Sequence, residues 1–349
     1  MAGLKLLTPA VVALALSATA AAEPSALTVA GTPEALSASG PVVALATADT
    51  GNGCSIRLVD FAHGGKTVAV RGALPCAAGW DGAEASIAGL WLGAKAVFAV
   101  TDDAPTIEGE KRLLWSAKLP RGTLDAVDAG WSWSTNAPFQ AGCAWSVAAG
   151  GGVVATTHAP NFLGPDNGMT AVALCVGRPT TTILLSGARR TRIYVRGSWR
   201  LLAADGRRIA LARLDPVGAP TGELALVGLD GKRLSAPHVA AVDARAATRG
   251  WLTPSGLVLR TQSGLVGPGW RLAHISAATV ARDRVVYVRD GRVEVRKIRG
   301  RADRTVLRLP ARSSRAFLAA GSFGVALAVA QSGTGRTALY RLTWQTLEG

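Results

Sequence analysis

One stretch of the chain, from Trp199 to Leu234, contains a complete unit of four short predicted strands. Asp205-Gly206 and Asp230-Gly231 are tight-turn pairs, and each joins two runs of mainly apolar residues. A longer loop with two prolines connects the two hairpins. Four antiparallel strands of this length cannot bury both faces of their sheet alone, so the unit needs neighbours of its own kind.

The same order of apolar run, Gly-rich turn and β-branched run recurs to give seven predicted copies. Their first hairpins span Ala35 to Thr47, Gly89 to Thr101, Trp145 to Thr157, Arg200 to Ala212, Gly250 to Thr261, Ala278 to Gly291 and Ala316 to Ala330. Third strands are expected from Ser55, Arg112, Thr170, Glu223, Trp270, Arg292 and Thr337. Fourth strands are expected from Thr67, Thr123, Thr181, Arg233 and Thr305. Because the fifth copy has no clear fourth strand, six units with an irregular insertion remain an alternative.

The two ends of the repeat array complement each other. The last copy ends after its third strand, at Trp344, while Ala26 to Gly31 forms an extra strand with no hairpin of its own. Radial packing, with this first strand completing the last sheet, explains both facts and leaves only short edges. We therefore expect an all-β fold: a single β-propeller domain over residues 23–349, with seven four-stranded antiparallel blades.

The clearest repeat resembles a known family. Trp199, then Asp205-Gly206, Ile209 to Leu211 and Asp230-Gly231, is similar to the WD40-like repeat of TolB-type propellers, which reads roughly W-S-P-D-G-x-x-I-A-F, then a strand and D-G. Ala203-Ala204 stand where Ser-Pro is usual, and most other copies keep only the turn glycine. The resemblance implies a propeller that tends to bind other molecules, and it implies no reaction.

The N-terminus has the form of an export signal. Residues 1–22 contain Lys5, an apolar stretch and small residues before Glu23-Pro24, so we expect a cleaved signal peptide and a secreted or extracytoplasmic cell-envelope protein. The apolar run is too short and alanine-rich to favour an uncleaved membrane anchor. No later run is long enough to span a bilayer without strand-like turns, and we expect a monomer.

Four cysteines fit an oxidising compartment. Three pairings are open, and we favour Cys54 with Cys76 and Cys143 with Cys175, because each pair then lies within one blade. The absence of a C-x-x-C spacing argues against a metal site.

Charge is distributed unevenly along the chain. The net charge is +15; residues 1–177 carry 9 Lys and Arg against 13 Asp and Glu, and the remainder carries 29 against 10. Such a field attracts anionic polymers such as acidic polysaccharides or envelope phosphate polymers, with no specific nucleic acid implied. The alternative is codon bias, since arginine far outnumbers lysine. The candidate anion-binding residues are Arg189, Arg190, Arg192, Arg296, Arg299 and Arg301.

Further candidates lie in the long loops that should gather on one rim of the ring. Trp80, Trp131 and Trp133 lie off the strand pattern and either stack on a ligand or fill gaps between blades. The other candidates there are Asp102, Asp103, His158, Asp166 and Asn167. Asp102 and Asp103 could bind Ca²⁺ or form a hydrolytic pair, although their spacing favours a solvated acidic loop. A lone histidine in such a loop is more often a turn residue than a catalytic one.

Two classes of function follow from these features. The first is an exported, non-catalytic scaffold that binds a protein, peptide or anionic polysaccharide on one rim, without a cofactor. The alternative is a propeller hydrolase or lyase acting on a sugar or lactone, with Ca²⁺ as a candidate cofactor. The chain has no G-x-S-x-G elbow and no H-E-x-x-H helix. Converging carboxylates and histidine at the mouth of the central channel would favour the enzyme, and an apolar lining would favour the scaffold.

Overall fold

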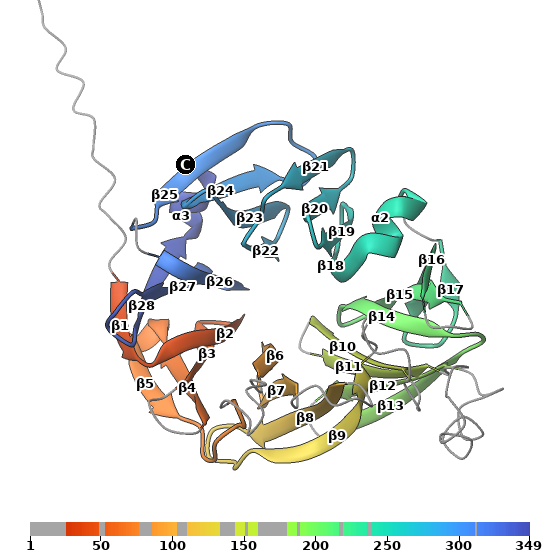
Figure 1. Ribbon diagram of the computed structural model, residues 1–349, viewed down its shortest axis with the longest axis horizontal. Helices are drawn as coiled ribbons and strands as arrows, with labels where there is room; N and C mark the ends of the chain where they lie inside the picture. The colour runs from red at the N-terminus through yellow and green to blue at the C-terminus, as the bar shows by residue number, and fades with distance from the viewer. Residues whose placement is uncertain are drawn as a thin grey trace, which may run out of the picture.

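The computed structural model places β-sheets radially around a central axis (Figure 1). The residues that it describes are 26–48, 53–76, 86–102, 110–132, 144–150, 153–159, 180–186, 189–215, 219–235, 239–310 and 313–349. The predicted signal peptide lies outside these residues. The all-β propeller architecture is confirmed for the described part of the chain.

The strands form six sheets, of which five have four strands each. The first sheet contains β2 (Thr32–Ser39), β3 (Val42–Ala48), β4 (Cys54–Asp60) and β5 (Lys66–Ala69). Another contains β14 (Trp199–Ala204), β15 (Arg208–Leu214), β16 (Pro220–Gly228) and β17 (Arg233–Leu234). The next contains β18 (Ala247–Thr253), β19 (Gly256–Thr261), β20 (Gly264–Gly267) and β21 (Trp270–Ala273). It is followed by β22 (Ala277–Ala281), β23 (Arg284–Arg289), β24 (Arg292–Lys297) and β25 (Asp303–Arg308).

The remaining four-stranded sheet joins the two ends of the chain. It contains β1 (Ala26–Ala30), β26 (Ser313–Gly321), β27 (Gly324–Gln331) and β28 (Arg336–Thr343). β1 pairs antiparallel with β28, so that Ala26 faces Tyr340 and Ala30 faces Arg336. The expected closure of the ring by its N-terminal strand is therefore confirmed.

The expectation of seven separate sheets is wrong. The second and third predicted copies are hydrogen-bonded into one eight-stranded sheet, because β9 and β10 meet in a parallel register at Trp131 and Ala144. Its strands are β6 (Ser86–Leu92), β7 (Ala96–Asp102), β8 (Glu110–Lys118), β9 (Asp125–Ser132), β10 (Ala144–Gly150), β11 (Val153–Ala159), β12 (Thr180–Ser186) and β13 (Arg189–Val195).

Two strand assignments need correction. In the third copy, β12, expected as a fourth strand, pairs directly with β11 and is followed by β13. The segment expected as its third strand, from Thr170, lies outside the described residues. In the fifth copy, the segment from Trp270 is the fourth strand, because the short β20 pairs between β19 and β21. β20 has four residues and a glycine at each end, too little pattern to identify a strand from sequence.

Apolar side chains fill the spaces between neighbouring sheets. At the closure, Phe61 and Phe323 pack edge to face with ring centroids 4.9 Å apart. Trp199, at the start of β14, is fully buried, and its indole N–H donates to the Arg196 carbonyl at 2.8 Å. Trp199 is thus a packing residue, as its place in the strand pattern predicts.

A disulfide joins Cys54 and Cys76, with their Cα atoms 5.6 Å apart. Cys54 begins β4, and its backbone exchanges two hydrogen bonds of 2.9 Å with Leu74. The bridge therefore ties the segment after β5 back to its own sheet, and a loop of this length contributes about 3 kcal/mol on the chain-entropy model. The expected partners Cys143 and Cys175 lie outside the described residues.

Helical segments are short and peripheral. They are η1 (Phe61–His63), α2 (Ala241–Ala246) and α3 (Trp344–Glu348). Within the described ranges, no helix is long and apolar enough to cross a membrane.

Candidate functional site: a cavity on the ring axis

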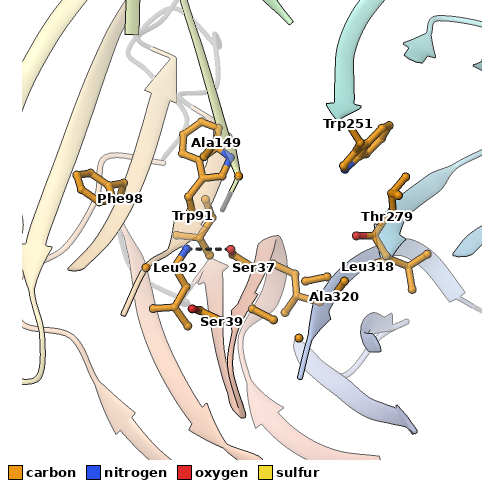
Figure 2. A pocket seen from close by; sticks show the side chains of 18 of the residues that line it. Ser37, Ser39, Trp91, Leu92, Phe98, Ala149, Trp251, Thr279, Leu318 and Ala320 are labelled. Carbon is orange, nitrogen blue, oxygen red and sulfur yellow. Dashed lines mark hydrogen bonds between the residues drawn. The ribbon is translucent and has the colours of Figure 1, made fainter. Parts of the chain in front are cut away.

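The inner strands of the ring enclose a cavity of about 430 Å³ (Figure 2). Its walls come mainly from β2, β6, β10, β18, β22 and β26, each the first strand of a repeat, with Phe98 of β7 and Val154 of β11. Segments far apart in the sequence therefore meet on the axis. A concave site lined by several elements is a common form of small-molecule site.

Two tryptophans dominate the cavity. Trp91 on β6 and Trp251 on β18 lie on opposite sides of it in Figure 2. Gly89 provides room for the first, because a Cβ at this glycine would lie 2.5 Å from the Trp91 ring. Two indoles facing one space offer flat apolar surfaces on which a planar group or a sugar ring can stack.

Hydroxyl groups lie between the apolar walls. Ser37, Ser39 and Thr279 line the cavity with Leu92 and Leu318. The Ser37 hydroxyl accepts a hydrogen bond of 2.9 Å from the Leu92 N–H, which links β2 to β6. Its own proton remains available to a ligand.

A second cavity of about 220 Å³ adjoins the first and shares Leu36, Leu90, Arg249, Trp251 and Leu318 with it. The N-terminal halves of the inner strands line this second cavity, and their C-terminal halves line the first. It therefore lies toward the end where the chain enters each inner strand, which is the end predicted to carry the long loops.

Arginines give the second cavity its charge. Arg249 on β18 and Arg260 on β19 both line it, and the guanidinium of Arg249 lies 5.2 Å from the centroid of the Trp251 ring. Surrounding protein lowers the pKa of both arginines by removing water from their charged groups, although Arg249 still reaches solvent inside the channel. Both remain charged, since arginine does not deprotonate in proteins.

The predicted acidic site has a different environment. Asp102, at the end of β7, faces Arg112 across the strand pair, and its Oδ1 lies 2.5 Å from the arginine Nε. This ion pair occupies the Asp102 carboxylate. Among the described residues, no group of three His, Cys, Asp or Glu could hold a metal ion. Asp103, Asp166 and Asn167 lie outside the described residues, as do Trp80 and Trp133.

Besides Asp102 at the end of β7, two further candidates expected in loops lie on strands instead. Trp131 is the penultimate residue of β9, and His158 is near the end of β11, because both strands extend further than their apolar patterns predicted. His158 faces Thr181 of β12 in the backbone register. The described part of the chain thus does not bring these candidates together at the cavity.

The predicted anion-binding arginines lie outside the ring axis. Arg189, Arg190 and Arg192 are on β13, the last strand of the eight-stranded sheet. Arg296 is engaged, since its Nε lies 2.6 Å from Asp303 and its guanidinium covers the Trp270 ring at 5.5 Å. Arg192, Arg299 and Arg301 are exposed.

Sequence reasoning missed the residues of the axial site. Trp91 and Trp251 follow strand alternation and were therefore expected to pack between blades. On an inner strand, the sequence pattern does not distinguish a side chain facing a neighbouring sheet from one facing the channel. Arg249 could have been noticed in the sequence, because it lies one residue before a predicted hairpin, whose register places it opposite Arg260. Like charges facing each other across strands are unfavourable, and their presence asks for a reason.

Comparisons with known proteins give no family. No family model matches the chain, and no curated protein matches it. Among solved structures, the chain is similar to Pyrococcus horikoshii acylaminoacyl peptidase, with 13% identity and a TM-score of 0.46 over 85% of this chain and 50% of that one. It thus spans about half the length of that peptidase.

Two other solved structures are similarly distant. An uncharacterized protein from Listeria monocytogenes EGD-e shows 9% identity and a TM-score of 0.46, over 91% of this chain and 97% of that one. The β-propeller domain of the Trilobed protease from Pyrococcus furiosus shows 12% identity and a TM-score of 0.37, over 79% and 98%. None of these likenesses bears on function, and the TolB-type resemblance stays a prediction.

Proposed function

We propose that this chain is an exported, non-catalytic binding propeller that holds a sugar-containing ligand in its axial cavity. The observation that carries the proposal is the pair Trp91 and Trp251, which face one cavity from opposite sides of the ring. A propeller supplies rigid inner strands, so these indoles are positioned before a ligand arrives. Such preorganisation reduces the entropic cost of binding.

The chemistry of the lining favours binding over hydrolysis. The described residues around the larger cavity include hydroxyls, indoles, aliphatic side chains and one arginine, but no carboxylate or histidine. Glu34, in the adjoining cavity, contacts Arg315 Nη1 with both carboxylate oxygens, at 2.9 and 3.0 Å. A glycosidase needs a pair of carboxylates flanking the scissile bond. Hydrolysis of a sugar is therefore the alternative function that the experiment below must exclude.

The test is tryptophan fluorescence titration of the protein lacking residues 1–22 with oligosaccharides released from the producing cell's envelope. We expect saturable quenching that Trp251→Phe and Trp91→Phe each weaken. Trp270→Phe is the matched control, because this indole lies on β21, lines neither axial cavity and donates to Ile298 O at 2.6 Å. Quenching lost equally in all three variants would contradict the proposal. Release of shortened products on incubation would favour the hydrolase.

Export is part of the same proposal. The Cys54–Cys76 bridge supports an oxidising compartment, where such bonds persist. Mass spectrometry of the protein recovered from culture medium or envelope should find a mature N-terminus at Glu23. Recovery only from the cytoplasm, with Met1 retained, would contradict export.

We also propose that the eight-stranded sheet behaves as two packing units. Phe98 and Leu114 of its first half form one apolar cluster with Trp145 and Val154 of its second half, like the clusters between separate sheets. In a hydrogen-exchange measurement, the backbone amides of β7 and β11 should then be strongly protected, and those at the contact between β9 and β10 weakly protected.

A further inference from the structure

We propose that Arg249 and Arg260 form an oxyanion site, and that it takes the carboxylate of an acidic sugar whose ring lies against Trp251. The inference rests on the proposed function, because it specifies which sugar-containing ligand the axial cavity holds. Nothing in the fold itself requires two arginines at this position.

The backbone register places the two arginines together. Arg249 on β18 and Arg260 on β19 are directly opposite each other, so their side chains leave the sheet on the same face. Both side chains line the smaller cavity. Two like charges directly opposite each other are unfavourable, and an anion bound between them would relieve their repulsion.

Both guanidinium groups have unused donors. Among the described residues, Arg249 makes no hydrogen bond and no ion pair, and its guanidinium packs over the Trp251 ring. Arg260 donates through Nη2 to the carbonyl of Ile275, while its buried Nη1 has no partner. Arginine donors arranged in a fork match the two oxygens of a carboxylate. The pair can therefore bind one carboxylate from two directions once a shift of the Arg260 side chain uncovers its buried Nη1.

The charge of the cavity is not neutralised from within. Glu34 is the one carboxylate among the described lining residues, and Arg315 pairs with it. The groups facing the cavity thus sum to an excess of positive charge, carried by the solvent-exposed Arg249 and the half-buried Arg260. A ligand anion gains more from the half-buried guanidinium of Arg260 than from a fully exposed arginine.

The rest of the lining selects the body of the ligand. Trp251 adjoins the arginines. Hydroxyls also line the two cavities, from Thr279 on the inner strand β22 and from Ser276 just before it. A hydroxylated ring with a carboxylate on a ring carbon uses the indole, the hydroxyls and the guanidinium groups at once. A peptide C-terminus offers the carboxylate but no ring hydroxyls, so we favour the sugar.

The test is calorimetric titration of the protein lacking residues 1–22 with glucuronate, glucose and an acetylated dipeptide. We expect glucuronate to bind best and Arg249→Gln to weaken it about tenfold or more, as loss of a charged hydrogen bond implies. Arg282→Gln is the matched control, because this arginine also covers a tryptophan, Trp344, at 3.9 Å, but lies on the outside. It should leave glucuronate binding unchanged.

The outcomes separate the two proposals. Equal binding of glucose and glucuronate, both insensitive to Arg249→Gln, would overturn the oxyanion site but leave the axial sugar site intact. Preference for the dipeptide would overturn the sugar as the source of the carboxylate. Binding that Arg282→Gln weakens as much as Arg249→Gln would show an effect of net charge and would overturn the site. Absence of any binding that depends on Trp251 would overturn the proposed function itself.

Discussion

The arginines of the outer sheets and those of the channel differ in their partners. On β23 to β25, Arg289 and Arg296 lie 2.6 Å from Glu294 and Asp303, respectively, in a cluster that also encloses the buried Tyr287. Burial and the two neighbouring carboxylates raise the pKa of Tyr287 far above its ordinary value. In the channel, Arg249 has no carboxylate partner among the described residues, and Arg260 faces it.

This difference shows that many arginines of an arginine-rich sequence are not available to bind a ligand, because other residues of the protein already pair with them. Outer arginines are largely used for stability, through carboxylates and through tryptophan faces such as that of Trp270. Channel arginines are held against their mutual repulsion by the fold, which is the usual mark of a site that sacrifices stability for binding. Substitutions in the two regions should therefore have opposite effects on stability.

The largest effect is expected from breaking the outer cluster. Glu294→Gln leaves Arg289 without its nearest carboxylate in a buried setting, since Glu294 is only 9% exposed. We expect a loss of about 3 kcal/mol in the free energy of unfolding, measured by urea denaturation. Glu348→Gln, which removes an exposed pair with Arg282, should cost less than about 1 kcal/mol. Similar losses for both would remove the contrast between buried and exposed pairs.

The second prediction opens the ring while leaving the outer arginines in place. Gly31, between β1 and β2, has φ +90°, and a Cβ there would lie 2.7 Å from Thr47 Cβ and 2.8 Å from the Ala48 carbonyl. Gly31→Ala should destabilise the protein by about 2 kcal/mol and weaken axial binding. Gly333→Ala is the control, with φ +75° but open space around it and no part in the axial cavities, and should cost about 1 kcal/mol. Equal effects would mean that the closure tolerates a side chain here.

The third prediction is a change in the free energy of unfolding that is opposite in sign to the first. Arg249→Gln removes one of two facing charges, so the free energy of unfolding should rise by about 0.5 kcal/mol. Arg296→Gln should lower it by about 2 kcal/mol, because Asp303 loses its closest partner. The same urea titration measures both variants. A destabilised Arg249→Gln protein would indicate a packing role for this arginine.

The smallest effect concerns the exposed charges. Arg299→Gln with Arg301→Gln should reduce the dependence of heparin binding on log salt concentration by about two, one for each lost contact. Arg249→Gln should leave this slope unchanged, because a polymer chain does not enter a cavity of about 220 Å³. If Arg249→Gln changed the slope and the substitutions at Arg299 and Arg301 did not, then the polymer would bind at the channel and not at the exposed arginines.

The repeat and its closure could be predicted from the sequence because local patterns determine them. Turn residues and alternating runs locate the first hairpins, although the turn between β22 and β23 is Arg282-Asp283 and has no glycine. The unpaired strand at Ala26 had one unfinished sheet to complete. The third strands of two copies could not be predicted. Assigning a third strand requires knowing which apolar segment pairs with the second strand, and the sequence does not show this. The short β20, for example, pairs with β19 although its sequence pattern is weak.

The candidate site was harder to predict because it is a property of the ring. Trp91 and Trp251 are 160 residues apart in the sequence and meet only when the inner strands surround the axis. Loop position, charge and spacing pointed instead to residues such as Asp102, which pairs with Arg112. The facing arginines at 249 and 260 were a clue only together with their place on a first hairpin, since Arg289 and Arg292 also face each other across an outer hairpin.

A crystal structure of the protein with glucuronate tests the central claim most directly. The account predicts the carboxylate in contact with both the Arg249 and Arg260 guanidinium groups, and the sugar ring against Trp251. Density for the sugar on the outer face of β13 or β25, or an Arg249 side chain turned away to pair with Glu34, would contradict it.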